Sequence, residues 1–161
     1  MEELRDLYVE QLKDAWSAEN QLLEALPKMI ENVGDESLRS AFEQHLSKTE
    51  GHVDRLQNIF EAMGEKPGGK KCKGMEGLLK EGEEVLKEDG AQEVKDAAMI
   101  GAAQKVEHYE MALYGTLRTY ARRIGRPDDE ALLQQTLNEE EEADRVLTDI
   151  AESHVNEQAE R

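Results

Sequence analysis

The sequence predicts an all-α protein, and three observations lead to this expectation. Aromatic residues make up only 4% of the 161 residues, and there are three prolines. Strands are enriched in β-branched and aromatic residues, so this composition favours helices. Four long segments repeat apolar residues at the three- and four-residue spacing of a helix, and no segment alternates as a strand does. The length suits one domain with a core, which we expect over residues 1–157.

The first helical hairpin is expected in the first 63 residues. The first helix covers about residues 2–33, with an apolar stripe that runs from Leu4 to Ile30. Pro27 lies inside this helix and is expected to bend or loosen it. Gly34 makes the turn, and the second helix covers about residues 36–63. Gly64 is expected to end it, as glycine commonly does at helix C-termini.

The second half of the chain predicts a short helix and two more long ones. A glycine-rich loop at residues 64–74 precedes a short helix at about residues 75–88. A long helix follows at about residues 92–124 and ends at the Gly125 break. The last helix covers about residues 128–156, with Asp128 or Asp129 as its N-cap. Residues 158–161 are expected to fray.

Loop lengths predict how these helices are arranged. The short turns at Gly34 and Gly125 define two antiparallel hairpins, and the long segment of residues 64–91 joins them. Two hairpins with one long crossover make the ferritin-like antiparallel four-helix bundle. The alternative is a simple up-down-up-down bundle with a flexible insertion in the middle.

Charge and cysteine content limit the function classes. The net charge is −17, and the one basic cluster, at residues 66–73, is short, so neither nucleic acid nor a membrane surface is an expected partner. The acidity fits a solvated surface, a salt-adapted source or ligand carboxylates. No apolar segment is long enough to span a membrane. The single cysteine, Cys72, excludes an intramolecular disulfide and fits a cytoplasmic protein. Neighbouring lysines would lower the pKa of its thiol, although a lone thiol in a loop is usually inert.

Two carboxylates interrupt the apolar stripe of the third long helix. Glu107 and Glu110 lie on the same face as Ile100, Met111 and Leu117, at about 100° of rotation per residue. An unpaired ionised carboxylate in an apolar interior costs several kcal/mol or more. Either this face is solvated, or a cation neutralises the pair.

Each of the other long helices also carries polar residues on its apolar stripe near its midpoint. They are Glu19 in the first helix, His52 in the second, and Glu140 followed by Asp144 in the last. Midpoints of antiparallel helices meet at one level of a bundle. Glu19 and His52 are 33 residues apart, as are Glu107 and Glu140, which indicates two related hairpins.

These polar residues predict a centre of two metal ions. Bundle cores that bind two ions use glutamates from two helices and Glu-x-x-His from the other two. Oxygen-rich sites with some imidazole suit iron or manganese, and zinc is also compatible. We expect Glu107 and Glu140 to bridge or chelate, Glu19, Glu110 and Asp144 to coordinate terminally, and His52 to supply nitrogen.

Other polar residues are expected to lie outside the ligand set. His45 stands roughly 10 Å along the helix from His52, so it is expected to be structural or to support a ligand. His108 and His154 are expected at the surface or at a bundle end. In the acidic run of residues 139–142, only Glu140 is expected to point inward.

Several segments resemble the YciE/YciF family of ferritin-like proteins over nearly the whole chain. The resemblance rests mainly on residues 102–110 (AAQKVEHYE), with support from residues 26–29, 114–117 and 136–140. It implies a ferritin-like bundle with a rubrerythrin-like dimetal centre, a homodimer and an association with stress responses. Ala143 and Thr49 stand where the His and Glu of the fuller Glu-x-x-His pattern would be.

The function expected from the sequence is that of a cytoplasmic dimetal protein, with two iron ions that react with oxygen or peroxide. Two alternatives remain open at this stage. One is a non-catalytic acidic helical protein that holds a passive structural ion or water in a polar core. The other is a subunit of an iron-storage cage, which differs from a dimer in assembly size.

Overall fold

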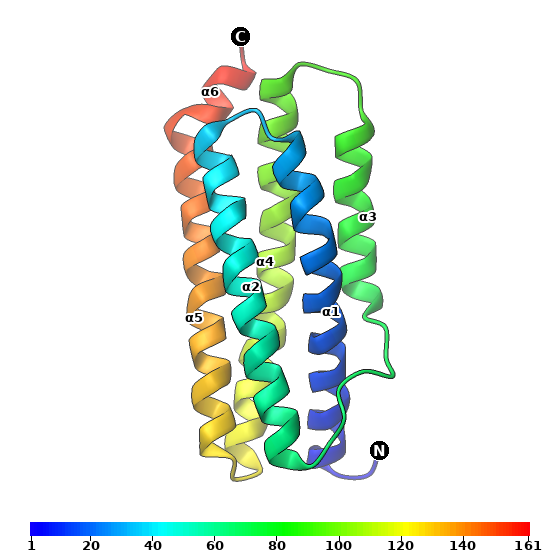
Figure 1. Ribbon diagram of the computed structural model, residues 1–161. Helices are drawn as coiled ribbons and strands as arrows, with labels where there is room; N and C mark the ends of the chain where they lie inside the picture. Colours follow the sequence, from blue (N-terminus) through cyan, green and yellow to red (C-terminus); the bar gives the residue numbers. More distant parts are fainter.

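Four long helices pack side by side with alternating direction, and a fifth, shorter helix lies against them (Figure 1). The computed structural model describes residues 1–161. The bundle consists of α1 (Leu4–Asn32), α2 (Glu36–Met63), α4 (Gln92–Arg123) and α5 (Pro127–Ile150), and the shorter helix is α3 (Lys73–Lys87). No strand is present. The all-α prediction and the single long crossover are confirmed, and α3 packs on α1 and α4 rather than forming a flexible insertion.

Local signals in the sequence fix most helix ends. The Asp35 carboxylate accepts a hydrogen bond from the Leu38 N–H at 2.9 Å and so caps α2. Gly64 ends α2 in the left-handed region at φ 67°, where a side chain would be strained. Pro27 does not end α1, which continues to Asn32.

The start of α5 differs from the expectation. Neither Asp128 nor Asp129 is its N-cap, because the helix begins at Pro127, whose fixed φ suits the first helical position. The Asp129 carboxylate instead accepts a hydrogen bond from the Tyr8 hydroxyl at 3.0 Å and pairs with Arg126. This contact ties the start of α5 to α1.

Cys72 is the N-cap of α3 and is buried. Its sulfur accepts a hydrogen bond from the Met75 N–H and lies 3.0 Å from the Tyr109 hydroxyl oxygen. Burial raises the pKa of the thiol, so the expectation that lysines would lower it is wrong. The thiol therefore serves as a helix cap.

The C-terminal segment is not one continuous α-helix to residue 156. After Ile150 the chain makes a π-helical turn, η1 (Ala151–Val155), and continues as α6 (Asn156–Ala159). Ile150 and Val155 are both buried, although five residues separate them. An α-helix would place these side chains about 140° apart, whereas a wider turn brings them to one face. His154 reaches Asp35 at the end of the bundle, at 2.9 Å.

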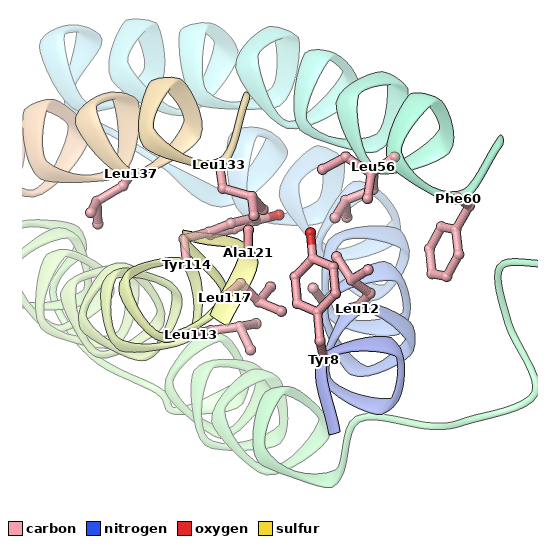
Figure 2. Packing of buried hydrophobic residues seen from close by; sticks show 12 residues of the cluster. Tyr8, Leu12, Leu56, Phe60, Leu113, Tyr114, Leu117, Ala121, Leu133 and Leu137 are labelled. Carbon is pink, nitrogen blue, oxygen red and sulfur yellow. The ribbon is translucent and has the colours of Figure 1, made fainter. Parts of the chain in front are cut away.

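Two apolar clusters fill the two ends of the bundle. One contains Leu12, Leu56 and Leu117, which converge from three helices in Figure 2. The other, toward the opposite end, contains Leu38 and Ile100. The polar residues described below lie between these clusters. No helix of the chain is both long enough and apolar enough to cross a membrane.

The buried carboxylate of Asp96 in α4 anchors the turn between α1 and α2. It accepts hydrogen bonds from the Gly34 N–H at 3.0 Å and the Asp35 N–H at 2.8 Å. We expect Asp96→Ala to lower the free energy of unfolding by about 2 to 3 kcal/mol, because both donors lose a charged acceptor. Urea denaturation measures this change. The exposed neighbour Glu93→Ala is the control, and an equal effect of both substitutions would contradict the anchoring role.

Candidate metal centre

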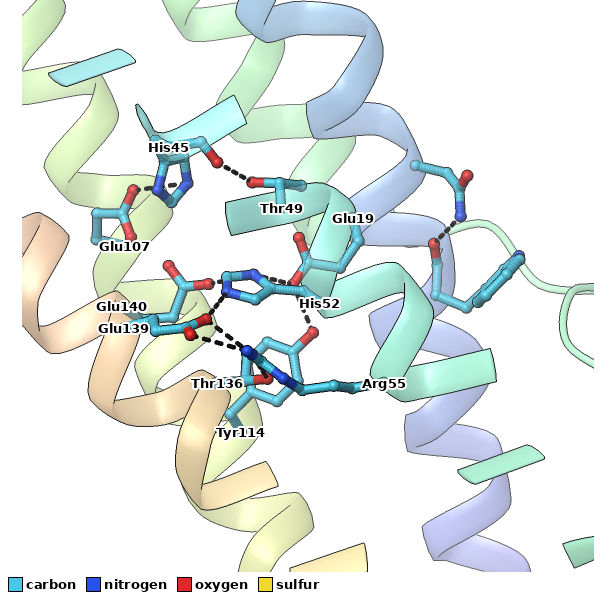
Figure 3. A network of polar contacts seen from close by, with 12 residues as sticks. Glu19, His45, Thr49, His52, Arg55, Glu107, Tyr114, Thr136, Glu139 and Glu140 are labelled. Atoms are coloured by element: carbon cyan, nitrogen blue, oxygen red, sulfur yellow. Dashed lines mark hydrogen bonds and ion pairs between the residues drawn. The ribbon is translucent and has the colours of Figure 1, made fainter. Parts of the chain in front are cut away.

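Six ionisable side chains meet in the middle of the bundle, between the two apolar clusters. All are buried, with at most 7% of any residue exposed. Figure 3 labels five of them around a common space. The six are contributed by all four long helices: Glu19 from α1, His45 and His52 from α2, Glu107 and Glu110 from α4, and Glu140 from α5.

These side chains form two overlapping groups. The first consists of Glu19, His52, Glu110 and Glu140, and the second of His45, Glu107, Glu110 and Glu140. Within each group, one nitrogen or oxygen atom of every residue lies within 4.8 Å of the others. Glu110 and Glu140 belong to both groups. Glu107, which was expected to bridge or chelate, belongs to one group only, whereas Glu110, which was expected to coordinate terminally, belongs to both.

His52 connects the inner cluster to a polar pair at the bundle surface. Its Nδ1 atom lies 2.9 Å from Glu140 Oε1 and 3.3 Å from Glu19 Oε1. Its Nε2 atom lies 2.9 Å from Glu139 Oε2, and Arg55 donates to both Glu139 oxygens at 2.7 and 2.8 Å. Metal-ligating histidines commonly donate their other N–H to a carboxylate in this way, which fixes the ring.

In the second group, His45 is the residue that contacts Glu107. Its Nε2 atom lies 3.1 Å from Glu107 Oε1. Thr49, which replaces the expected glutamate, donates its hydroxyl to the His45 carbonyl of its own helix at 2.8 Å. In the first half, the Tyr114 hydroxyl donates to Glu19. The chain therefore presents two inner histidines, where the sequence pattern indicated one.

Many ligand-type atoms in this cluster have no hydrogen-bond partner. Both oxygens of Glu110 and of Glu140 are buried without a partner, as is one oxygen of Glu19 and of Glu107. Buried polar atoms in native proteins are almost always paired, because an unpaired one costs about 1 to 3 kcal/mol, and more when charged. Carboxylate oxygens and imidazole nitrogens suit iron, manganese or zinc. These residues therefore fit a pair of metal ions.

Two pairs of residues in the cluster have pKa values that are shifted for different reasons. Burial and the neighbouring carboxylates raise the pKa of Glu110 and Glu140 well above the usual value of 4.5. Burial also opposes charging of Glu19 and His52. Their mutual attraction outweighs it, lowering the pKa of Glu19 and raising that of His52.

Asp144 lies away from the cluster. Its Oδ2 atom is 3.2 Å from His108 Nε2, and Oδ1 accepts from the Gln104 side chain at 3.2 Å. Four helical residues separate it from Glu140, which moves it one turn along α5 and about 40° around it. The rotation turns it toward the outer edge of α4. The residue belongs to a contact between α4 and α5 and not to either group.

Two residues that the sequence did not predict as part of the cluster lie in it or against it in the structure. His45 is seven residues before His52 and therefore on the same face of α2. Although their backbones lie roughly 10 Å apart along the helix, the two ring centres are 6.4 Å apart. The seven-residue spacing from His52 could have indicated that His45 faces the same interior. Glu139 was expected in solvent, and the Arg55 partner that holds it against His52 lies too far away in sequence to be recognised.

The raised pKa values of Glu110 and Glu140 predict how stability depends on pH when no metal is bound. Above pH 4.5 the unfolded chain releases these protons while the native chain retains them. The free energy of unfolding then falls as pH rises. We expect chelator-treated protein to lose stability as the pH rises above 4.5, relative to the variant Glu110→Gln with Glu140→Gln. Urea titrations at several pH values measure the difference, and a pH-independent difference would contradict the prediction.

Comparisons with known proteins agree on one family. Residues 3–160 match the family model described as "Domain of unknown function (DUF892)". The chain is 44% identical to Protein YciF of Escherichia coli K12 over 161 residues, which cover 99% of this chain and 97% of that protein.

Two solved structures have the same fold. The crystal structure of the E. coli stress protein YciF matches with a TM-score of 0.93 and 43% identity, over 97% of this chain and 99% of that one. The Rhodopseudomonas palustris protein YcfI matches with a TM-score of 0.89 and 39% identity, over 92% and 94% of the two chains. The resemblance predicted from residues 102–110 is thus confirmed. The chain belongs to the DUF892 family, which includes YciF.

Proposed function

We propose that this protein binds two iron ions in the cluster between the apolar ends of its bundle. The observation that carries the proposal is the pair of overlapping four-residue groups, which share Glu110 and Glu140. Glu19 and His52 would complete one position, and His45 and Glu107 the other. Two of these residues would thus lie between the ions, as in carboxylate-bridged bundle sites.

Charge balance supports two divalent ions rather than one. The cluster contains four carboxylates, from Glu19, Glu107, Glu110 and Glu140. Their four negative charges equal the positive charge of two divalent ions. One ion would leave two buried carboxylates to be protonated or repelled, which the close spacing makes costly. Two ions would also offer partners to the carboxylate oxygens of the cluster that have no hydrogen bond.

The proposed role is the handling of iron and of oxygen or peroxide during stress, by a cytoplasmic homodimer. Bound iron supplies one-electron oxidation and reduction, so a pair of ions would supply the two electrons that convert hydrogen peroxide and two protons to water. The buried, carboxylate-rich cluster fits two such iron ions. The crystal structure of the E. coli relative is that of a stress protein, which agrees with this role.

Metal content tests the assignment. We expect purified, iron-loaded protein to hold two ions per chain by elemental analysis, and the variant Glu107→Ala with Glu140→Ala to hold fewer than one. A matched control replaces the exposed residues Glu93 and Glu141 with alanine and should retain both ions. Equal metal content in the two double variants would end the site assignment.

The same preparations test turnover and assembly. Ferrous protein mixed with peroxide should develop ferric absorbance in the wild type and the control. Bound metal without an absorbance change would instead identify a passive structural ion. Gel filtration of the same samples should give a dimer, and a large assembly would favour iron storage.

Glu139 provides a test that leaves the ligands intact. We expect Glu139→Gln to weaken metal binding by about 10- to 100-fold, because the amide orients the His52 ring less strongly and does not increase its basicity. Competition titration with a chromophoric chelator measures the affinity. Glu141→Gln, two residues away and exposed, should leave it unchanged. An unchanged affinity in Glu139→Gln would show that the contact to His52 does not support the site.

A further inference from the structure

A cavity of about 100 Å³ lies beside one half of the polar cluster. Side chains from all five helices α1 to α5 line it, and most of them are apolar. Leu22 and Leu26 of α1 form one wall, and Leu78 and Leu79 of α3 form another. Figure 1 shows α3 running alongside α1, where it covers this side of the bundle.

The inner end of the cavity is polar and lacks partners. His45 and Glu107 line it there, and both are buried. Neither His45 ring nitrogen has a hydrogen bond of good geometry, and Glu107 Oε2 has no partner. The other half of the cluster, with Glu19 and His52, does not line the cavity. The cavity therefore distinguishes the two halves of the centre.

Small side chains create this space. Ala25, Ala102, Ala103 and Ala143 face it from α1, α4 and α5. Ala143 is three residues after Glu140, which is the position of the histidine in Glu-x-x-His. The alanine at this position leaves room beside Glu107, and His45 on α2 supplies the second imidazole.

The dimensions and chemistry of the cavity define what fits in it. Apolar cavities with a volume of this order bind xenon or small hydrocarbons. A charged molecule would lose its hydration against apolar walls. The outer rim carries Lys28 and Lys48 with Glu83 and Glu142, so its charges balance and it favours neither anions nor cations.

The cover over the cavity is α3, which packs on both α1 and α4. Met75 is the one buried residue of α3, whereas Leu78, Leu79 and Leu86 are half-buried. A single ion pair at the rim joins α1 to α3, between Lys28 and Glu83 at 4.0 Å, and both side chains are exposed. Such a pair contributes little to stability. A second exposed ion pair, between Lys105 and Glu81 at 3.1 Å, joins α3 to α4, so apolar packing on α1 and α4 holds most of the cover in place.

We propose that this cavity binds a small, uncharged, largely apolar organic molecule whose one polar group lies against His45 and Glu107. Binding itself needs only the cavity. The further statement that the molecule contacts the metal ion on the His45 side, and is thus a substrate or effector of that ion, rests on the proposed function.

Xenon tests the cavity without metal. Crystals of chelator-treated protein under xenon pressure should show a xenon atom between Leu26, Leu79 and Ala143. The substitution Ala143→Leu should abolish it, as should Ala25→Leu from the opposite wall if the first variant does not fold. Ala131→Leu, at an exposed position of α5, should retain it. Absence of xenon from the wild type, or its persistence in both filled variants, would overturn the proposal.

Cobalt tests the contact with the centre. In Co²⁺-loaded protein, 1-propanol should shift the visible d–d bands of the wild type and of Ala131→Leu, but not of Ala143→Leu. If xenon binds in the crystals but 1-propanol leaves the bands of the wild type unchanged, the contact with the metal is refuted. The proposal that the cavity binds a small molecule is then retained. Failure of the protein to bind Co²⁺ would refute the metal site alone, since the xenon result does not depend on it.

Discussion

The burial of four carboxylates in the centre of a narrow bundle is the constraint on which the rest of the structure depends. Such a cluster destabilises any fold that lacks compensating interactions, because both desolvation and mutual repulsion oppose it. The apolar clusters on either side supply the opposing free energy, and each is built from all the long helices. Within the cluster, His52 and Tyr114 support Glu19, while the oxygens of Glu110 and Glu140 have no hydrogen-bond partner.

The fold could be predicted from the sequence because its determinants are local. Helical periodicity gave the helices, and Gly34, Gly64 and Gly125 marked three of the breaks. The interruption after Ile150 could not be predicted in this way. The π-helical turn exists because Val155 has to reach the apolar cluster at that end of the bundle, and this requirement comes from tertiary packing. Cys72 is similar: only its burial against Tyr109 explains why nearby lysines do not set its pKa.

The candidate site could be predicted in part, for the same reason. Glu19, His52, Glu107, Glu110 and Glu140 interrupt apolar stripes near the helix midpoints, and the structure brings all five together. Which histidine lies opposite Glu107 depends on how α2 is aligned with α4 along the bundle axis. The spacing of residues in the sequence does not determine this alignment. As a result His45 joins the cluster opposite Glu107, and Asp144 remains outside with His108. The membership of Glu110 and Glu140 in both groups likewise follows from packing.

The two nitrogens of His52 face different surroundings, and this has a consequence for protons. Nδ1 faces the closed cluster, whereas Nε2 faces Glu139, whose side chain is 23% exposed. A route of two side chains, His52 and Glu139, thus leads from the buried cluster toward bulk water. The helices need not separate for a proton to travel along it, since an imidazole can accept on one nitrogen and release from the other. Arg55 holds the outer carboxylate in place, so this route stays intact while Nδ1 is free to carry a proton, and a metal ion on Nδ1 would close it.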